Sequence, residues 1–216
     1  MGDDENLVPD KLSIFRKILA RLGKIYYWRK PKKVNLWLIS SMAYAVTKKY
    51  EEIFEGDTGA AVDKFTEHFV NGAKSIMFEM QERVKLLYSK SLEDLEFVAT
   101  IALYVILGPN WNKMFEPPVF IPADRTESGL AQFRVRWPVC ALCAGILPGV
   151  DLDTEKMQDH NYGELLAAAL ASLLQMVQDY VGNDYTIDIK ETKCLLRGDP
   201  YGEAIMNFNP SNPSGK

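Results

Sequence analysis

The stretch YTIDIKETKCLLRGDPYGEAIMNF, residues 185–208, has the pattern of two strands joined by a turn. Ile187 and Ile189 alternate with polar residues, as they do in a strand with one buried face. The tripeptide Gly198-Asp199-Pro200 is typical of a turn, because glycine tolerates left-handed backbone and proline fixes its own φ. The segment therefore predicts a closing β-hairpin with strands over 185–196 and 202–208.

Outward from this hairpin, residues 130–137 alternate apolar and polar in the manner of another half-buried strand. Hydrophobic periodicity predicts helices over 12–28, 35–54, about 60–87, 92–107 and 162–180. Pro117, Pro118 and Pro122 predict loop or extended chain, and Ser91 with Asp94 predicts a helix cap. The order predicts an α+β fold, with helices packed on one face of a small antiparallel sheet.

The helix predicted over 35–54 has a stripe of apolar residues expected to face the core. The stripe contains Leu36, Ile39, Ala43, Val46 and Tyr50.

Composition favours an intracellular protein. The chain has 216 residues, 47% of them hydrophobic, and three cysteines, which does not suit a secreted disulfide framework. The longest apolar run, residues 97–107, is about half of a membrane span. The acidic N-terminus lacks the pattern of a signal peptide. We therefore expect a cytoplasmic protein without a transmembrane helix.

Charge is distributed unevenly. Residues 11–33 contain nine basic and no acidic residues, so a net charge of −4 leaves −13 for the rest of the chain.

A helix with apolar residues on one side and cations on the other is typical of an interfacial membrane helix. Packing of this helix on its own domain, with its charges in water, is the alternative, and its aromatic end also suits a protein partner. Nucleic acid is disfavoured because the body is acidic. The predicted membrane or partner surface contains Arg16, Lys17, Arg21, Lys24, Arg29, Lys30, Lys32 and Lys33.

Several segments resemble a superfamily that contains the small subunits of the TRAPP vesicle-tethering complex and the vinyl-reductase-type domain of ligand sensors. WLISSMAYAV at 37–46 is similar to the first TRAPP-type helix, and residues 63–83, with Gly72 in the middle, are similar to the second. Leu107-Gly108 ends a helix as in TRAPP subunits. ETKC at 191–194 and RGDPY at 197–201 resemble the closing hairpin of the vinyl-reductase type. The resemblance covers 34–208, leaving 1–33 as a basic extension and 209–216 as a disordered tail.

The resemblance implies an α/β sandwich that dimerises through its helices. Its TRAPP branch implies a non-catalytic scaffold or tethering subunit, peripheral to membranes, with a second copy, related subunits or a small GTPase as partners. Its vinyl-reductase-type branch implies instead a sensor that holds a small hydrophobic ligand in its interior.

Metal ligands of the zinc-bearing sensor type are incomplete in this chain. Glu191 and Cys194 match the family's Glu and first Cys, but Gly202 stands at the position of the next Cys. The C-x-x-C pair Cys140 and Cys143 has spacing suited to chelation or redox exchange, and it could complete a site with Cys194 or His160. Small buried thiols are the alternative interpretation. We expect no metal and no cofactor.

An apolar ligand would lie among the predicted helices. Residues 83–88 contain no cysteine at the place where TRAPP subunits carry an acyl chain, so only a non-covalent ligand is expected. Core packing is the alternative role for every lining residue. The candidate lining contains Phe69, Ile76, Met77, Met80, Val98 and Leu103.

Catalytic motifs are not evident. The chain has two histidines, His68 and His160, and lacks a nucleophile elbow, a P-loop and a dinucleotide fingerprint. We therefore expect the protein not to be an enzyme.

Overall fold

A computed structural model describes residues 9–29, 36–84, 87–140, 142–143, 159, 162 and 164–211. Its α-helices are α1 (Ile14–Arg29), α2 (Leu36–Ile53), α3 (Thr58–Val84), α4 (Leu95–Leu107) and α6 (Glu164–Val181). Its strands are β1 (Val119–Ile121), β2 (Ala131–Trp137), β3 (Tyr185–Lys193) and β4 (Gly202–Pro210). Short 3-10 turns cover Leu92–Asp94, Trp111–Lys113, Ala123–Arg125 and Leu195–Arg197. The predicted α+β class is confirmed.

The four strands form one antiparallel sheet in the order β1-β2-β4-β3. The predicted hairpin is confirmed, with Ile187 opposite Phe208 and Ile189 opposite Met206. Strand β1 lies in the proline-rich segment expected to be loop or extended chain. Three residues are too few to show alternation, and its position follows from pairing with β2, where Phe120 meets Phe133.

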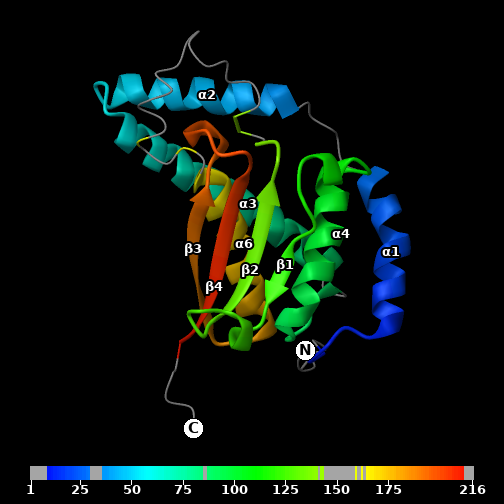
Figure 1. Cartoon of the computed structure of the whole chain (residues 1–216). Helices are drawn as coiled ribbons and strands as arrows, with labels where there is room; N and C mark the ends of the chain where they lie inside the picture. The colour runs from blue at the N-terminus through cyan, green and yellow to red at the C-terminus, as the bar shows by residue number, and fades with distance from the viewer. Residues whose placement is uncertain are drawn as a thin grey trace, which may run out of the picture.

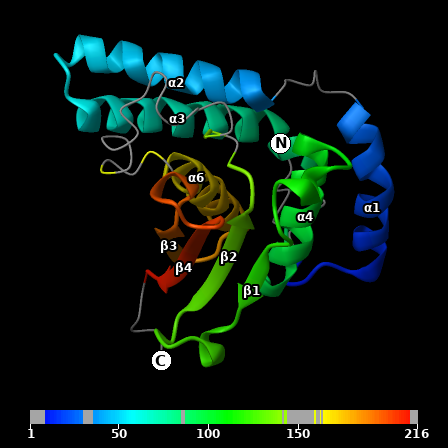
Figure 2. The ribbon, with the colours of Figure 1, turned by 45° about the horizontal axis from the view of Figure 1, so that its top comes forward.

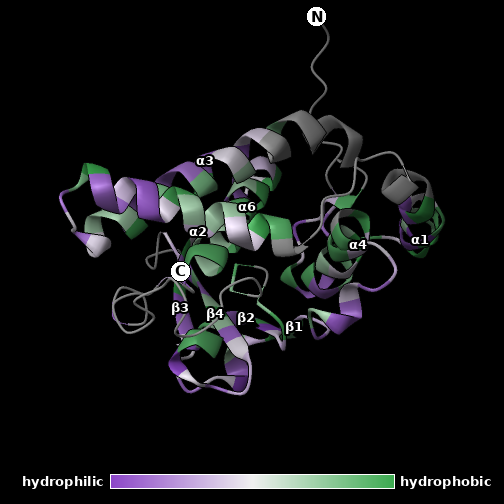
Figure 3. Ribbon diagram, turned by 90° about the horizontal axis from the view of Figure 1, so that it is seen from above, coloured by the Kyte–Doolittle hydropathy of each residue, from purple (hydrophilic) through white to green (hydrophobic). Residues whose placement is uncertain are grey.

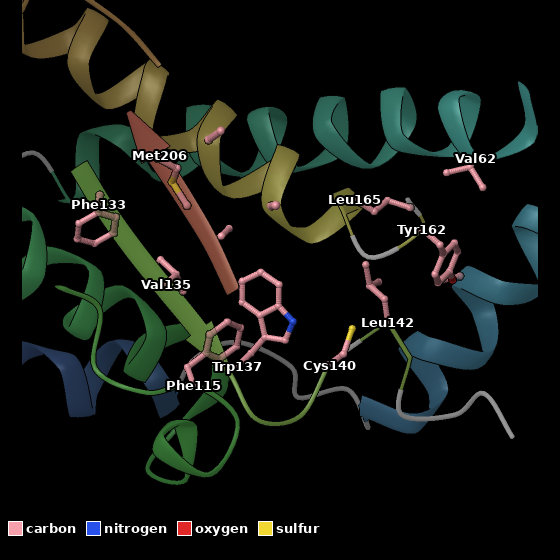
Figure 4. Close-up of a cluster of buried hydrophobic side chains, with 14 of the residues drawn as sticks. Val62, Phe115, Phe133, Val135, Trp137, Cys140, Leu142, Tyr162, Leu165 and Met206 are labelled. Carbon is pink, nitrogen blue, oxygen red and sulfur yellow. The ribbon is translucent and has the colours of Figure 1, made fainter. Parts of the chain in front are cut away.

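Helices α6 and α3 lie on one face of the sheet, whereas α4 and α1 stand beside its β1 edge (Figure 1). Helix α6 covers that face, α3 packs on α6, and α2 lies alongside α3 (Figure 2). Helix α4 stands beside β1, and α1 is outermost against α4. The sheet face turned toward α6 contributes the largest core side chains, several of which are drawn in Figure 4. They include Phe133, Val135, Trp137, Met206 and Phe208.

At each edge of the sheet, a side chain from a neighbouring helix hydrogen-bonds to backbone groups of the edge strand. On β3, the Gln175 amide donates to the Tyr185 carbonyl at 2.8 Å and accepts from the Ile187 N–H at 2.8 Å. On β1, the Phe120 N–H donates to Glu96 Oε1 at 2.7 Å. These contacts occupy backbone groups that an edge strand otherwise presents to a neighbouring chain.

The residue at the helix end explains where the helix begins or ends in two of three cases. The Asp57 carboxylate caps α3 by accepting the Ala60 N–H at 2.9 Å. Gly108, with φ of 87°, ends α4 where a side chain would be strained. The predicted Ser91–Asp94 cap is wrong, because neither side chain makes a capping hydrogen bond. Asp94 is buried and has other partners.

The C-terminal boundary also differs from the prediction. Strand β4 continues through Asn209 and Pro210, which pair with Thr186 and Tyr185, so the predicted tail loses its first two residues to the sheet. Residues 212–216 lie outside the described part of the chain.

Candidate functional site

Helix α1 turns its apolar stripe away from the domain. Ile14, Phe15 and Leu22 expose 78%, 68% and 69% of their surface. Ile18, Leu19 and Ile25 are exposed on the same side. Helix α1 does pack on its own domain, as the alternative expects, but through its cationic side against α4 and not through this stripe. We call these six residues the α1 stripe; exposed apolar patches of this kind are typical of surfaces that bind a partner.

The cations of α1 face the domain instead. Lys17 Nζ lies 2.7 Å from Asp94 Oδ1, Arg21 lies over the Phe97 ring, and Lys24 Nζ lies 4.4 Å from the centroid of Tyr104. A cation over an aromatic face is stabilised by the ring quadrupole, and its charged group stays in contact with water. Arg16 is half-buried. The Arg29 side chain and residues Lys30, Lys32 and Lys33 lie outside the described set.

Asp94 fixes α1 against the start of α4. Its side chain is almost fully buried and accepts hydrogen bonds from the Leu12 N–H at 2.6 Å and the Ser89 hydroxyl at 2.8 Å. Burial alone would raise the pKa of Asp94, but Leu12, Lys17 and Ser89 lower it below its usual value. The carboxylate is thus held charged, and it ties the Lys17 side of α1 to the start of α4.

Helix α2 also directs large apolar side chains outward. Leu38, Met42 and Ile53 are 45%, 59% and 60% exposed, and Ile39 and Val46, expected in the core, are more than one-third exposed. The buried side holds small or polar residues instead, with Ser40, Ala43 and Thr47 nearly inaccessible. Figure 3 shows hydrophobic residues recurring along α2 in the view from above. We call Leu38, Ile39, Met42, Val46 and Ile53 the α2 stripe.

The structure brings together only some of the residues predicted to line an apolar ligand site. Phe69 and Leu103 pack against the main core, as the core-packing alternative expects. Val98 lines a cavity of about 10 Å³, room for about one water. The side chains of Ile76, Met77 and Met80 on α3 lie outside the described set.

A larger cleft of about 410 Å³ lies between α1, α4 and the segment before β1. Arg21, Lys24 and Glu96 line it together with Phe97 and Pro117, so its wall is charged and aromatic. It is an open surface cleft outside the predicted lining.

The cysteines and Glu191 meet at the end of the sheet near α2. Cys140 Sγ and Cys143 Sγ are 2.7 Å apart, and the charge of Glu191 acts on all three thiols. The Glu191 side chain is 3% exposed, and its Oε2 lies 3.4 Å from an Arg197 nitrogen. Burial raises the pKa of Glu191 to about 7, although Arg197 and the Cys194 thiol act to lower it. Among the described residues, no group of three or more potential ligands has a geometry that could hold a metal ion.

Gly202 explains the gap in the ligand pattern. A Cβ at this position would overlap Nε1 and Cε2 of the Trp137 indole and lie 2.5 Å from Cδ1. Trp137 is 1% exposed and points into the core beside the start of β4 (Figure 4). The indole therefore fills the space that a cysteine side chain at 202 would need.

The chain matches no protein-family model, and no curated protein sequence matches it significantly. Among the described helices, none is long and apolar enough to cross a membrane.

Proposed function

We propose that the protein is a non-catalytic, TRAPP-like scaffold or tethering subunit that dimerises through α2 and attaches peripherally to membranes through α1. The observation that carries the proposal is the outward orientation of the α1 and α2 stripes. Two helices that expose their large apolar residues and turn small or cationic ones toward the domain suit a protein that functions by binding partners on these faces.

The two stripes suit different partners. The α2 stripe has no charged residue between Leu38 and Val46, and a helix face of this kind can meet its own copy across a two-fold axis. The α1 stripe belongs to the segment that contains nine basic residues; Lys17 and Lys24 turn toward the domain, whereas the Arg21 side chain remains exposed. Apolar side chains inserted at the headgroup boundary, with cations beside anionic lipids, are the features of interfacial attachment.

Met42→Glu is expected to convert the dimer into a monomer. Met42 is 59% exposed in the single chain, so the substitution leaves the protomer intact, whereas in the dimer it buries an unpaired charge. A cost of about 3 kcal/mol corresponds to a dissociation constant raised roughly a hundredfold. Sedimentation equilibrium measures it, with Leu22→Ser as the matched exposed substitution on α1. A wild-type monomer, or a dimer insensitive to Met42→Glu, contradicts dimerisation through α2.

The double variant Phe15→Ser, Leu22→Ser is expected to bind phosphatidylserine-containing vesicles about tenfold more weakly, because it removes two of the three most exposed apolar side chains of the α1 stripe. Co-sedimentation with vesicles measures the binding, and phosphatidylcholine vesicles report the contribution of charge. Met42→Ser is the control, since it removes an exposed apolar side chain from α2. Equal loss in the control, or none in the double variant, would contradict attachment through α1.

A further inference from the structure

The Cys140–Cys143 pair lies in a tight turn that follows β2. Besides the 2.7 Å separation of the two sulfur atoms, the Cys143 N–H donates to the Cys140 carbonyl at 3.3 Å. This sulfur separation is inside ordinary van der Waals contact and roughly 0.7 Å longer than a disulfide bond. A small closure of the turn would therefore join the two sulfurs.

The turn is also held from the side of α2. The Ser40 hydroxyl, which is fully buried, donates to the Leu142 carbonyl at 2.7 Å, and Leu142 is 1% exposed. This bond anchors one of the two residues between the cysteines, so it restrains the turn that brings the sulfur atoms together. Close approach before bond formation is the main requirement for fast reaction of two groups.

The two thiols are chemically unequal. The hydrogen bond from the Cys143 thiol lowers the pKa of Cys140, whereas pairing with Cys140, followed by burial, raises the pKa of Cys143. Of the two thiols, Cys140 is therefore the one that ionises more readily. Burial also raises the pKa of Cys194, which makes it a poorer nucleophile than Cys140.

We propose that Cys140 and Cys143 form a reversible redox site that is oxidised by a small peroxide to an intramolecular disulfide. The Cys140 thiolate attacks one oxygen of hydrogen peroxide, the O–O bond breaks, and hydroxide leaves and takes up a proton, giving Cys140 sulfenic acid and water. The Cys143 sulfur then attacks the Cys140 sulfur, and a second water leaves as the S–S bond forms. Two thiols and one peroxide yield one disulfide and two waters, and an external dithiol reverses the change by exchange.

The exposure of the two cysteines decides which oxidants can reach their sulfur atoms. Cys140 is 4% exposed, and Cys143 is half-buried. A bulky disulfide cannot reach the Cys140 sulfur, whereas a peroxide of nearly the size of water can. Oxidation is therefore expected with hydrogen peroxide and not with oxidised glutathione.

The test is intact-mass spectrometry of the full chain after brief treatment with hydrogen peroxide. We expect a loss of about 2 Da, and peptide mapping should show Cys140 and Cys143 protected from alkylation until a dithiol is added. Cys143→Ser should instead gain about 16 Da and be trapped by dimedone at Cys140. Cys194→Ala is the matched control and should still lose about 2 Da.

Three outcomes would overturn the proposal. One is loss of the 2 Da change in Cys194→Ala, which would assign the bond to Cys194. The second is gain of oxygen without a disulfide in the wild type. The third is native mass spectrometry that finds one zinc ion per chain, released only when Cys140 and Cys143 are alkylated. If Cys143→Ser fails to fold, peptide mapping of the wild type alone still decides the first two.

Discussion

Gly202→Ala is expected to lower the free energy of unfolding by about 3 kcal/mol or more. The added methyl group would overlap the Trp137 indole, which is held on all sides in the core, and overpacking of a rigid core costs about 1–3 kcal/mol or more. The backbone at Gly202 has an ordinary φ, so the cost is steric. Urea denaturation followed by tryptophan fluorescence and circular dichroism measures it.

A double-mutant cycle with Trp137→Leu separates this clash from other effects. Trp137→Leu alone removes buried surface and destabilises, but in its presence Gly202→Ala should cost less than about 1 kcal/mol, because the space is then open. The matched control is Gly72→Ala on α3, where an added Cβ meets nothing within 4 Å. Additive costs in the cycle would mean that Trp137 is not what excludes a side chain at 202.

Glu191→Gln is expected to remove a large pH dependence of stability. The unfolded carboxyl titrates near its usual value of 4.5, and the folded one near 7. The folded chain therefore holds the proton over this interval, and its stability falls as the pH rises from about 4.5 through 7. A shift of this size corresponds to roughly 3 kcal/mol. The variant, which does not ionise, should be more stable than the wild type at pH 8 by an amount of this order.

Thermal unfolding at pH 5 and pH 8 measures the difference between variant and wild type. Glu203→Gln is the matched control. Burial alone would raise the pKa of Glu203, but Thr192 and Arg136 lower it, so its contribution is present above its unfolded pKa and is lost as the pH falls. At pH 8 the two variants should thus depart from the wild type in opposite directions, with Glu191→Gln more stable and Glu203→Gln less stable. A Glu191→Gln curve parallel to that of the wild type would show that Glu191 is charged in the folded protein at pH 5.

The sheet and helices were largely predictable because their patterns are local. Alternation around Phe133 and Ile187 marks the long strands, and periodicity marks the helices. Strand β1 was not predictable, because its three residues take their conformation from β2 and from the Glu96 side chain. The buried position of Asp94 also needed the structure, since its partners Leu12 and Lys17 lie about 80 residues away in the chain.

Which side of a helix faces the domain was the less predictable part of the site. Periodicity separates the two sides of α1 but does not say which one α4 receives. The rings of Phe97 and Tyr104 on α4 accept cations, and this contact overrides the expectation that apolar residues turn inward. On α2 the same failure placed Ile39 and Val46 in the core, because only contacts with α3 and the Cys140–Cys143 turn reveal that small residues are required there.

The proximity of Cys140 and Cys143 followed from their spacing, whereas the conflict between Trp137 and a side chain at 202 did not. The spacing of two residues suits a turn that brings thiols together. Trp137 and Gly202 are 65 positions apart and face each other only because β2 and β4 are neighbours in this register. The missing ligand is visible in the sequence, but the side chain that takes its space is not.

The side chains that hydrogen-bond to the two edge strands limit how copies of this protein can assemble. An open edge recruits another strand, and each addition presents a new edge, which is how filaments lengthen. Gln175 and Glu96 interrupt that process at β3 and β1 without the aid of a partner. Assemblies built from this chain should therefore close at a finite number of subunits and remain dispersed at concentrations where edge-pairing proteins form fibres.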